Sequence, residues 1–104
     1  MPSPVETPTL CVGEKRTLTF VTGLDFTNSN NNTALFTNLT TGNNLTFNNA
    51  SLTLVDTVTG VVTLSFNASE AGEYVGQITA SNNNATTGTT LKSPLFSLKV
   101  QTGL

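Results

Sequence analysis

Short segments that alternate apolar and polar residues constrain the fold of this chain more than any other feature. In residues 15–22, Leu18 and Phe20 fall on one face while threonines and a valine fall on the other. In residues 61–66 the apolar side chains again occupy alternate positions. Alternation is the pattern of a strand that buries one face, and no segment has the helical period of about 3.6 residues. The sequence therefore predicts an all-β chain.

Turn-forming residues separate these segments at intervals of about ten residues. Residues 41–44 and 57–60 have the composition of tight turns, and residues 23–32 are expected to form a polar loop. The expected strands cover residues 9–12, 15–22, 34–40, 45–47, 51–55, 61–66, 73–81 and 89–100. Seven or eight short strands of this kind predict an antiparallel β-sandwich, with a small jelly roll or barrel as the alternative.

Residues 69–74 have the most specific pattern in the chain. Glu70 and Gly72 lie in a turn that leads into an alternating segment, and Tyr74 is the first inward residue of that segment. Gly72 permits the positive φ that a tight turn often needs, and the Glu70 carboxylate is expected to accept hydrogen bonds from the free amides of the turn. Tyr74 is expected to place its ring in the core and its hydroxyl on the turn. These three residues are therefore predicted to form a structural corner.

The chain carries few charged side chains. Six acidic and four basic residues make up 10% of the sequence, whereas an average soluble domain has about 25%. No charged residue lies between Phe26 and Val55. A net charge of −2 without a basic cluster argues against a nucleic-acid partner. Neither an apolar run that could span a membrane nor a signal-peptide pattern is present in the sequence, so no membrane association is expected.

Catalytic and metal-binding functions are not expected from this composition. The chain has no histidine, which is the most common general base and a frequent metal ligand. Glu70 and Glu73 are three residues apart, but in a turn followed by a strand they need not converge. Calcium binding among Asp25, Asp56, Glu70 and Glu73 is the disfavoured alternative, because no Asp-x-Asp cluster is present. We therefore predict no enzyme activity, no cofactor and no metal site.

The prolines near the N-terminus divide the chain into two parts. Pro2, Pro4 and Pro8 predict an extended arm over residues 1–8. Residues 9–104 are expected to form the sandwich, since about a hundred residues are enough for one core and too few for two. An extended arm of this kind is expected to contact a neighbouring molecule, because free termini otherwise fray.

Two further residues lead to specific expectations. Pro94 has no amide donor, so the last strand is expected to lie at an edge of its sheet or to carry a bulge at this position. Cys11 is the only cysteine and cannot form an intrachain disulfide. Because Cys11 lies between Leu10 and Val12, we expect a small, buried, unreactive side chain.

Several of these patterns resemble immunoglobulin-like modules. A tyrosine corner such as that of Tyr74 is typical of them, but Gly76 occupies the place of the second cysteine and the chain has no tryptophan. Residues 13–20, the hairpin 56–64 and the Ala-Gly-x-Tyr corner are similar to the disulfide-free modules of tailed-phage virions and bacterial surface proteins. The resemblance implies an immunoglobulin-like sandwich over about residues 9–101, with a structural or adhesive role.

The resemblance, the low charge and the absent signal pattern together favour a non-enzymatic viral structural protein. We expect a decoration or cement protein of a tailed bacteriophage, located in the virion on the capsid surface and synthesised in the host cytoplasm. Its expected partners are the major capsid protein or other virion subunits, and a homo-oligomer is an alternative. The residues expected to contact these partners are Pro2, Pro4, Pro8, Asn30, Asn31, Asn83 and Asn84.

Two other functions remain open from the sequence. The first is a tail, baseplate or fibre module that binds a host surface, and the second is a bacterial surface adhesion module. Exposed aromatic side chains, which commonly bind sugars, are not expected here, because the six phenylalanines and one tyrosine fall mostly on inward positions.

Overall fold

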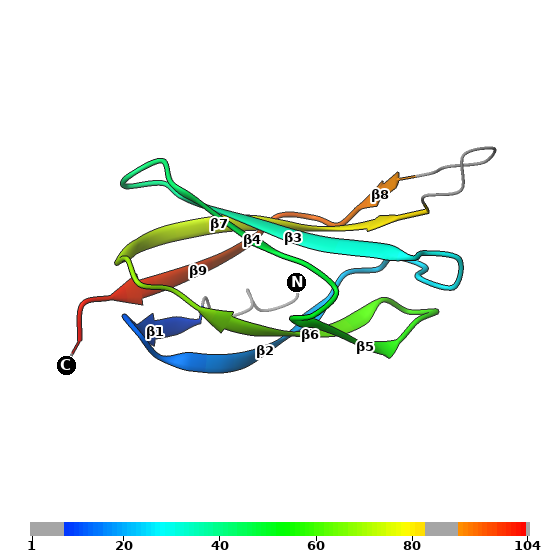
Figure 1. Ribbon diagram of the computed structural model, residues 1–104, viewed down its shortest axis with the longest axis horizontal. Helices are drawn as coiled ribbons and strands as arrows, with labels where there is room; N and C mark the ends of the chain where they lie inside the picture. The colour runs from blue at the N-terminus through cyan, green and yellow to red at the C-terminus, as the bar shows by residue number, and fades with distance from the viewer. Residues whose placement is uncertain (1–7, 83–89, 104) are drawn as a thin grey trace, which may run out of the picture.

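The computed structural model describes residues 8–82 and 90–103. In this part of the chain the backbone forms strands, turns and no helix, which confirms the predicted all-β class (Figure 1). Consequently no helix there is long and apolar enough to cross a membrane. The strands are β1 (Thr9–Cys11), β2 (Lys15–Val21), β3 (Asn31–Asn38), β4 (Asn44–Phe47), β5 (Leu52–Asp56), β6 (Val61–Asn67), β7 (Gly72–Ser81), β8 (Thr90–Lys92) and β9 (Phe96–Gln101).

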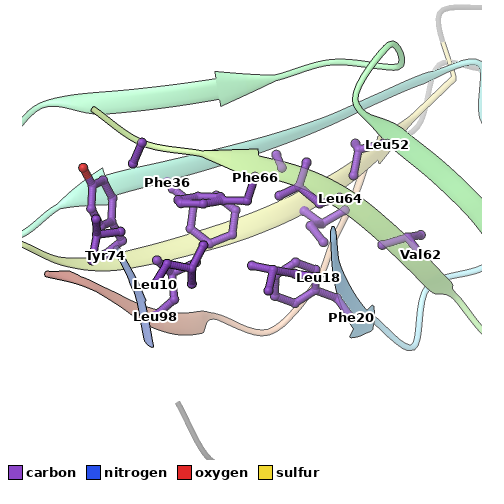
Figure 2. Close-up of a cluster of buried hydrophobic side chains, with 14 of the residues drawn as sticks. Leu10, Leu18, Phe20, Phe36, Leu52, Val62, Leu64, Phe66, Tyr74 and Leu98 are labelled. Carbon is purple, nitrogen blue, oxygen red and sulfur yellow. The ribbon is translucent and has the colours of Figure 1, made fainter. Parts of the chain in front are cut away.

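The strands form two sheets that face each other as a β-sandwich. One sheet has the order β1-β9-β7-β3-β4, with β8 paired to part of β7, and the other has the order β2-β6-β5. The pairs are antiparallel except for β1, which runs parallel to β9. The buried side chains of both sheets point into the space between them (Figure 2).

Alternate positions of the long strands supply this core, as the sequence predicts. The fully buried side chains include Phe36 from β3, Phe66 from β6 and Tyr74 from β7. The rings of Phe36 and Phe66 meet edge to face with centroids 5.4 Å apart, a geometry that adds about 0.5–1.5 kcal/mol to the effect of burial. Burial itself stabilises the fold by about 1.5–3 kcal/mol for each large apolar side chain.

Gly76 lies in the middle of β7, directly opposite Phe36 of β3 and Phe96 of β9. A Cβ atom at this position would collide with the Phe36 ring. The phenyl ring therefore occupies the space that a side chain at position 76 would need. This contact explains a glycine inside a strand, where glycine is otherwise unfavourable.

We expect Gly76→Ala to lower the free energy of unfolding by about 1–3 kcal/mol, the usual effect of overpacking a core. An alanine in a strand is otherwise favoured over glycine by about 0.5–1 kcal/mol, so steric overlap has to outweigh this preference. Urea denaturation followed by circular dichroism measures the difference. The control is the same substitution in a Phe36→Leu background, where it should cost less. An equal cost in both backgrounds would contradict the explanation.

Most of the predicted strand ends lie within one residue of the observed ones, but both ends of the strand predicted over 34–40 are wrong. Strand β3 begins at Asn31 and ends at Asn38. Asn31 and Asn32 pair with Ser81 and Ala80 of β7, and this pairing overrides the low strand preference of asparagine. The loop expected over 23–32 is correspondingly shorter.

The last predicted strand is divided into β8 and β9 at Pro94. Just before the proline, the Ser93 backbone N–H donates to the Ile78 carbonyl at 2.9 Å, and the Ser93 Oγ accepts the Ile78 N–H at 2.9 Å. The side chain of Ser93 therefore keeps the chain attached to β7 where the regular ladder stops. Pro94 lies at an edge of the sheet, as expected, because among the described residues β8 pairs only with β7 and β1 reaches β9 only from Lys99 to Gln101.

The expected burial of Cys11 is also wrong, because its side chain is half-buried. Strand β1 has only three residues, and Leu10 is the one that faces the core, with 1% of its surface exposed. Side chains alternate across a strand, so Cys11 must face the other way. Its Sγ atom lies 3.9 Å from Gln101 Nε2.

Candidate functional site

The corner between β6 and β7 is the most elaborate polar arrangement in the described part of the chain. The Tyr74 ring is 2% exposed and meets the Phe66 ring edge to face, with centroids 6.0 Å apart. Its hydroxyl donates to the Glu70 backbone carbonyl at 2.7 Å, so the expected return of the hydroxyl to the turn is present. The ring anchors the start of β7 in the core while the hydroxyl fixes the turn before it.

The Glu70 carboxylate accepts hydrogen bonds from the hairpin between β3 and β4. Thr41 Oγ1 donates at 2.6 Å, and Asn43 Nδ2 donates to both carboxylate oxygens at 3.0 and 3.2 Å. The expectation that amides of its own turn would be the donors is therefore wrong. The hairpin approaches the corner because β3 and β7 are neighbours in one sheet (Figure 1).

Asn38, at the end of β3, connects these parts and has no exposed surface. Its Nδ2 donates to Glu70 Oε1 at 3.1 Å and to the Ala71 carbonyl at 3.0 Å. Its Oδ1 accepts the backbone N–H groups of Thr40 and Thr41, at 2.8 and 3.2 Å. Four hydrogen bonds satisfy this buried amide, so it costs little to bury.

Gly72 is required beside Asn38 for two reasons. Its φ is +150°, a conformation that side chains other than glycine rarely adopt. A Cβ atom there would also collide with the Asn38 side chain. Glu70, Gly72 and Tyr74 thus form one unit with Asn38, a residue that the sequence reasoning did not single out. The unit joins the β6–β7 turn to the β3–β4 hairpin, and the polar groups named above bond to one another within the fold.

Two of the predicted partner contacts lie at the opposite end of β7. The Asn30 backbone N–H donates to the Ser81 carbonyl at 2.9 Å, and Asn31 pairs with Ser81. Asn31 is therefore a strand residue rather than a loop residue. Between the β2–β3 loop and the end of β7 lies an open hollow of about 150 Å³, lined by Asp25, Asn28, Ser29, Ala80, Ser81, Asn82 and Leu91.

The other predicted contacts do not join this group. Pro2, Pro4, Asn83 and Asn84 lie outside the described residues. Pro8 is half-buried, and its carbonyl accepts the Lys99 N–H at 2.9 Å, so it is attached to β9. Lys99, which bonds to Pro8, lies opposite Glu73 of β7, and Ser81, which bonds to Asn30, lies eight residues further along β7. At about 3.3 Å per residue, Pro8 and Asn30 are therefore separated by about 26 Å along the strand direction.

Asp25, beside the hollow, accepts the Thr27 hydroxyl at 2.5 Å and the Thr27 backbone N–H at 2.9 Å. These two bonds, first the hydroxyl and then the amide, lower the pKa of the Asp25 carboxyl below its ordinary value of 3.8. The pKa of the Asp56 carboxyl is also lowered, by hydrogen bonds from Thr59 and Val58 in the β5–β6 turn.

We expect the Asp25 carboxyl of Thr27→Val to titrate closer to 3.8 than that of the wild type, because the hydroxyl donor is lost and the amide donor remains. The lowered pKa stabilises the fold above pH 3.8, and this contribution disappears as the pH falls through the folded-state pKa. Carboxyl carbon NMR measures both midpoints. Asp56 in the same sample is the control and should not change. An unchanged Asp25 midpoint would contradict the assigned cause.

The outward face of the sheet β2-β6-β5 carries mainly hydroxyl and methyl groups, with Lys15 at one end of β2. Thr19, Thr63 and Thr53 form one row across the three strands, and Val21 faces Val61 in the next row. The outward side of the other sheet carries the exposed apolar side chains Leu35, 46% exposed, and Leu39, 61% exposed. A shallow groove of about 350 Å³ lies there, lined by Leu39, Glu73, Val75, Lys99 and neighbouring residues.

The carboxylates considered for calcium do not gather into one site. Glu70 faces the β3–β4 hairpin, whereas Glu73 lies opposite Lys99 on β9. Among residues 8–82 and 90–103, no three histidine, cysteine, aspartate or glutamate side chains lie close enough to hold a metal ion. Comparison of the chain with protein-family models and with curated protein sequences finds no match.

Proposed function

We propose that this chain is a non-enzymatic structural component of a tailed-phage virion, where it serves as a decoration or cement protein on the capsid surface. The observation that carries the proposal is the composition of its outward faces. Rows of threonine, serine and valine lie on one sheet, and exposed leucines and threonines lie on the other. The partners are the major capsid protein or other virion subunits.

The strand order supports an immunoglobulin-like fold for this role. In such domains strands C, F and G form one sheet and strands B, E and D the other, and variable-type domains add strand C′ beside C. The orders β9-β7-β3-β4 and β2-β6-β5 correspond to G-F-C-C′ and B-E-D. Phe36 over Gly76 fills the place where the disulfide and tryptophan of other members lie.

A surface with few charged side chains suits a permanent contact with neighbouring subunits. Charged residues are depleted at the centres of interfaces, because desolvating an ion costs several kcal/mol unless it is well paired. Hydroxyl and amide groups can form hydrogen bonds with a capsid without that cost, and exposed side chains such as Leu39 and Leu95 add apolar contact. Asn30 and the hollow beside it supply amide, hydroxyl and carboxylate groups at one end of the sandwich.

Mass spectrometry and cryo-microscopy of purified particles test this proposal. The chain should be present in hundreds of copies on the capsid exterior. Tens of copies, located on the tail, would favour the baseplate or fibre module instead. Particles that lack the chain, or its recovery from a bacterial cell surface, would contradict both virion roles.

A binding experiment with variants tests the proposed contact end. Asn30→Lys should weaken binding of the purified chain to capsids that lack it, because it puts a charge at the loop end. Ser69→Lys is the matched control, since it adds the same charge to an exposed position in the β6–β7 turn, at the other end of β7 from Asn30. Equal binding of the two variants would remove Asn30 from the interface.

A further inference from the structure

The sandwich has several sheet edges, and most of them are short or irregular. Strands β1 and β8 have three residues each and β4 has four. Strand β5 has five residues and a register shift between Leu54 and Asp56. Short strands and bulges are the usual protection against pairing with another chain.

Strand β2 is the exception. It has seven residues, its register with β6 is continuous from Lys15 to Val21, and it contains no proline. Among the described residues β2 pairs only with β6, so its other side is an edge of the sheet, at the bottom of Figure 1. No charged residue follows Arg16 on this strand. Beyond Lys15 and Arg16 at its start, it is a long, regular edge without the usual protective features.

The register determines which backbone groups of β2 face outward. The Thr22 N–H donates to the Gly60 carbonyl at 2.9 Å, which continues the antiparallel register of β2 with β6. In an antiparallel pair, every second residue bonds to the same neighbour. Even-numbered residues of β2 therefore bond to β6, and Lys15, Thr17, Thr19 and Val21 direct their N–H and C=O groups away from it.

We propose that this edge pairs with β2 of a second copy of the chain, antiparallel and about a two-fold axis at Leu18. The outward N–H and C=O groups of the two copies align only in a register that places odd-numbered residues of one β2 opposite odd-numbered residues of the other. Centring it on Leu18 uses all seven residues, with Thr17 opposite Thr19 of the partner subunit and Lys15 opposite Val21 of the partner subunit. This arrangement forms about eight backbone hydrogen bonds and joins the two three-stranded sheets into one.

The side chains of β2 are complementary to themselves in this register. Thr17 and Thr19 of the partner subunit form a cross-strand hydroxyl pair, and the aliphatic stem of Lys15 covers Val21 of the partner subunit. The two Lys15 ammonium groups lie at opposite ends of the paired strands, so no like charges face each other. Arg16 is held on its own subunit, by an ion pair with Glu14 and a hydrogen bond to the Thr9 carbonyl at 3.2 Å.

Analytical ultracentrifugation of the full-length chain tests the pairing without any virion component, so its outcome is independent of the virion proposal. The expected mass is twice the 10.9 kDa of one chain. Thr17→Lys combined with Thr19→Lys places lysine opposite lysine at two positions and should weaken dimerisation by about tenfold or more. Thr63→Lys combined with Ser65→Lys is the matched control, because these residues lie in the same rows but on the central strand β6.

Two further variants test the register and the backbone bonds. Thr17→Lys combined with Thr19→Glu places the two introduced charges opposite each other only in the register centred on Leu18, so this variant should remain a dimer in that register. Thr19→Pro removes an outward N–H and leaves the bonds to β6 in place, so it should give a folded monomer.

Three outcomes would overturn the proposal. One is a wild-type chain that stays monomeric at every concentration. Another is a dimer that the lysine pair on β2 and the lysine pair on β6 weaken equally. The third is a dimer that forms only when residues 1–7 are deleted, which would mean that the chain's own N-terminal segment occupies the edge.

Discussion

Tyr74→Ala is expected to lower the free energy of unfolding by about 3–5 kcal/mol, the cost of removing a large buried ring and leaving a cavity. The ring is 2% exposed and packs edge to face on Phe66. Tyr74 also lies near the start of β7, the strand that pairs with β3, β8 and β9. Urea denaturation followed by circular dichroism measures the loss. A decrease below about 1 kcal/mol would mean that the core closes around the missing ring.

Tyr74→Phe separates the hydroxyl from the ring. The phenylalanine keeps the packing and loses only the hydrogen bond to the Glu70 carbonyl, so the expected cost is about 0.5–1.5 kcal/mol. Glu70→Gln is the companion variant. It changes the Glu70 side chain but keeps the Glu70 backbone carbonyl, so the hydrogen bond from the Tyr74 hydroxyl should remain. An unchanged melting midpoint for Tyr74→Phe would contradict the role of the hydroxyl in fixing the turn.

The parts of the fold that follow from local pattern could be predicted from the sequence. Leu18 and Phe20 are buried while Val21 is 67% exposed, because alternation alone decides which side of a strand faces the core. The corner could also be predicted, since Glu70 and Tyr74 are only four residues apart.

Features that depend on distant partners could not be predicted in this way. Asn38 meets Glu70 across 32 residues of sequence, and nothing near either residue marks the other. Asn31 and Asn32 look like loop residues until β7 pairs with them. In the same way, the parallel pairing of β1 with β9 joins the two ends of the chain and leaves Cys11 facing away from the core. Local composition carries no signal for such pairings.

Asn38→Asp is expected to be as damaging as loss of the Tyr74 ring, about 3–5 kcal/mol at neutral pH, because it buries a charge without a compensating partner. The carboxylate can still accept the Thr40 and Thr41 amides. It can no longer donate to Glu70 Oε1 or to the Ala71 carbonyl, and it faces the Glu70 carboxylate instead. Denaturant unfolding at pH 7 measures the cost.

The cost of Asn38→Asp should also depend on pH. Burial and the nearby Glu70 carboxylate raise the pKa of the new carboxyl, so the folded state binds a proton more readily than the unfolded state. The deficit relative to the wild type should therefore shrink as the pH falls, since the protonated group is neutral and can donate one hydrogen bond. A deficit that stayed constant from pH 7 to pH 4 would rule out charge burial as its cause.

Asn43→Asp is the matched control, because Asn43 also donates to Glu70 but its side chain is exposed. Solvent screens the new charge there, so the expected cost is below about 1 kcal/mol. Adding Glu70→Gln to Asn38→Asp removes the opposing charge and supplies a donor, so the double variant should recover part of the lost stability. If it were no more stable than Asn38→Asp alone, the damage would come from the lost Ala71 contact rather than from two carboxylates in one buried site.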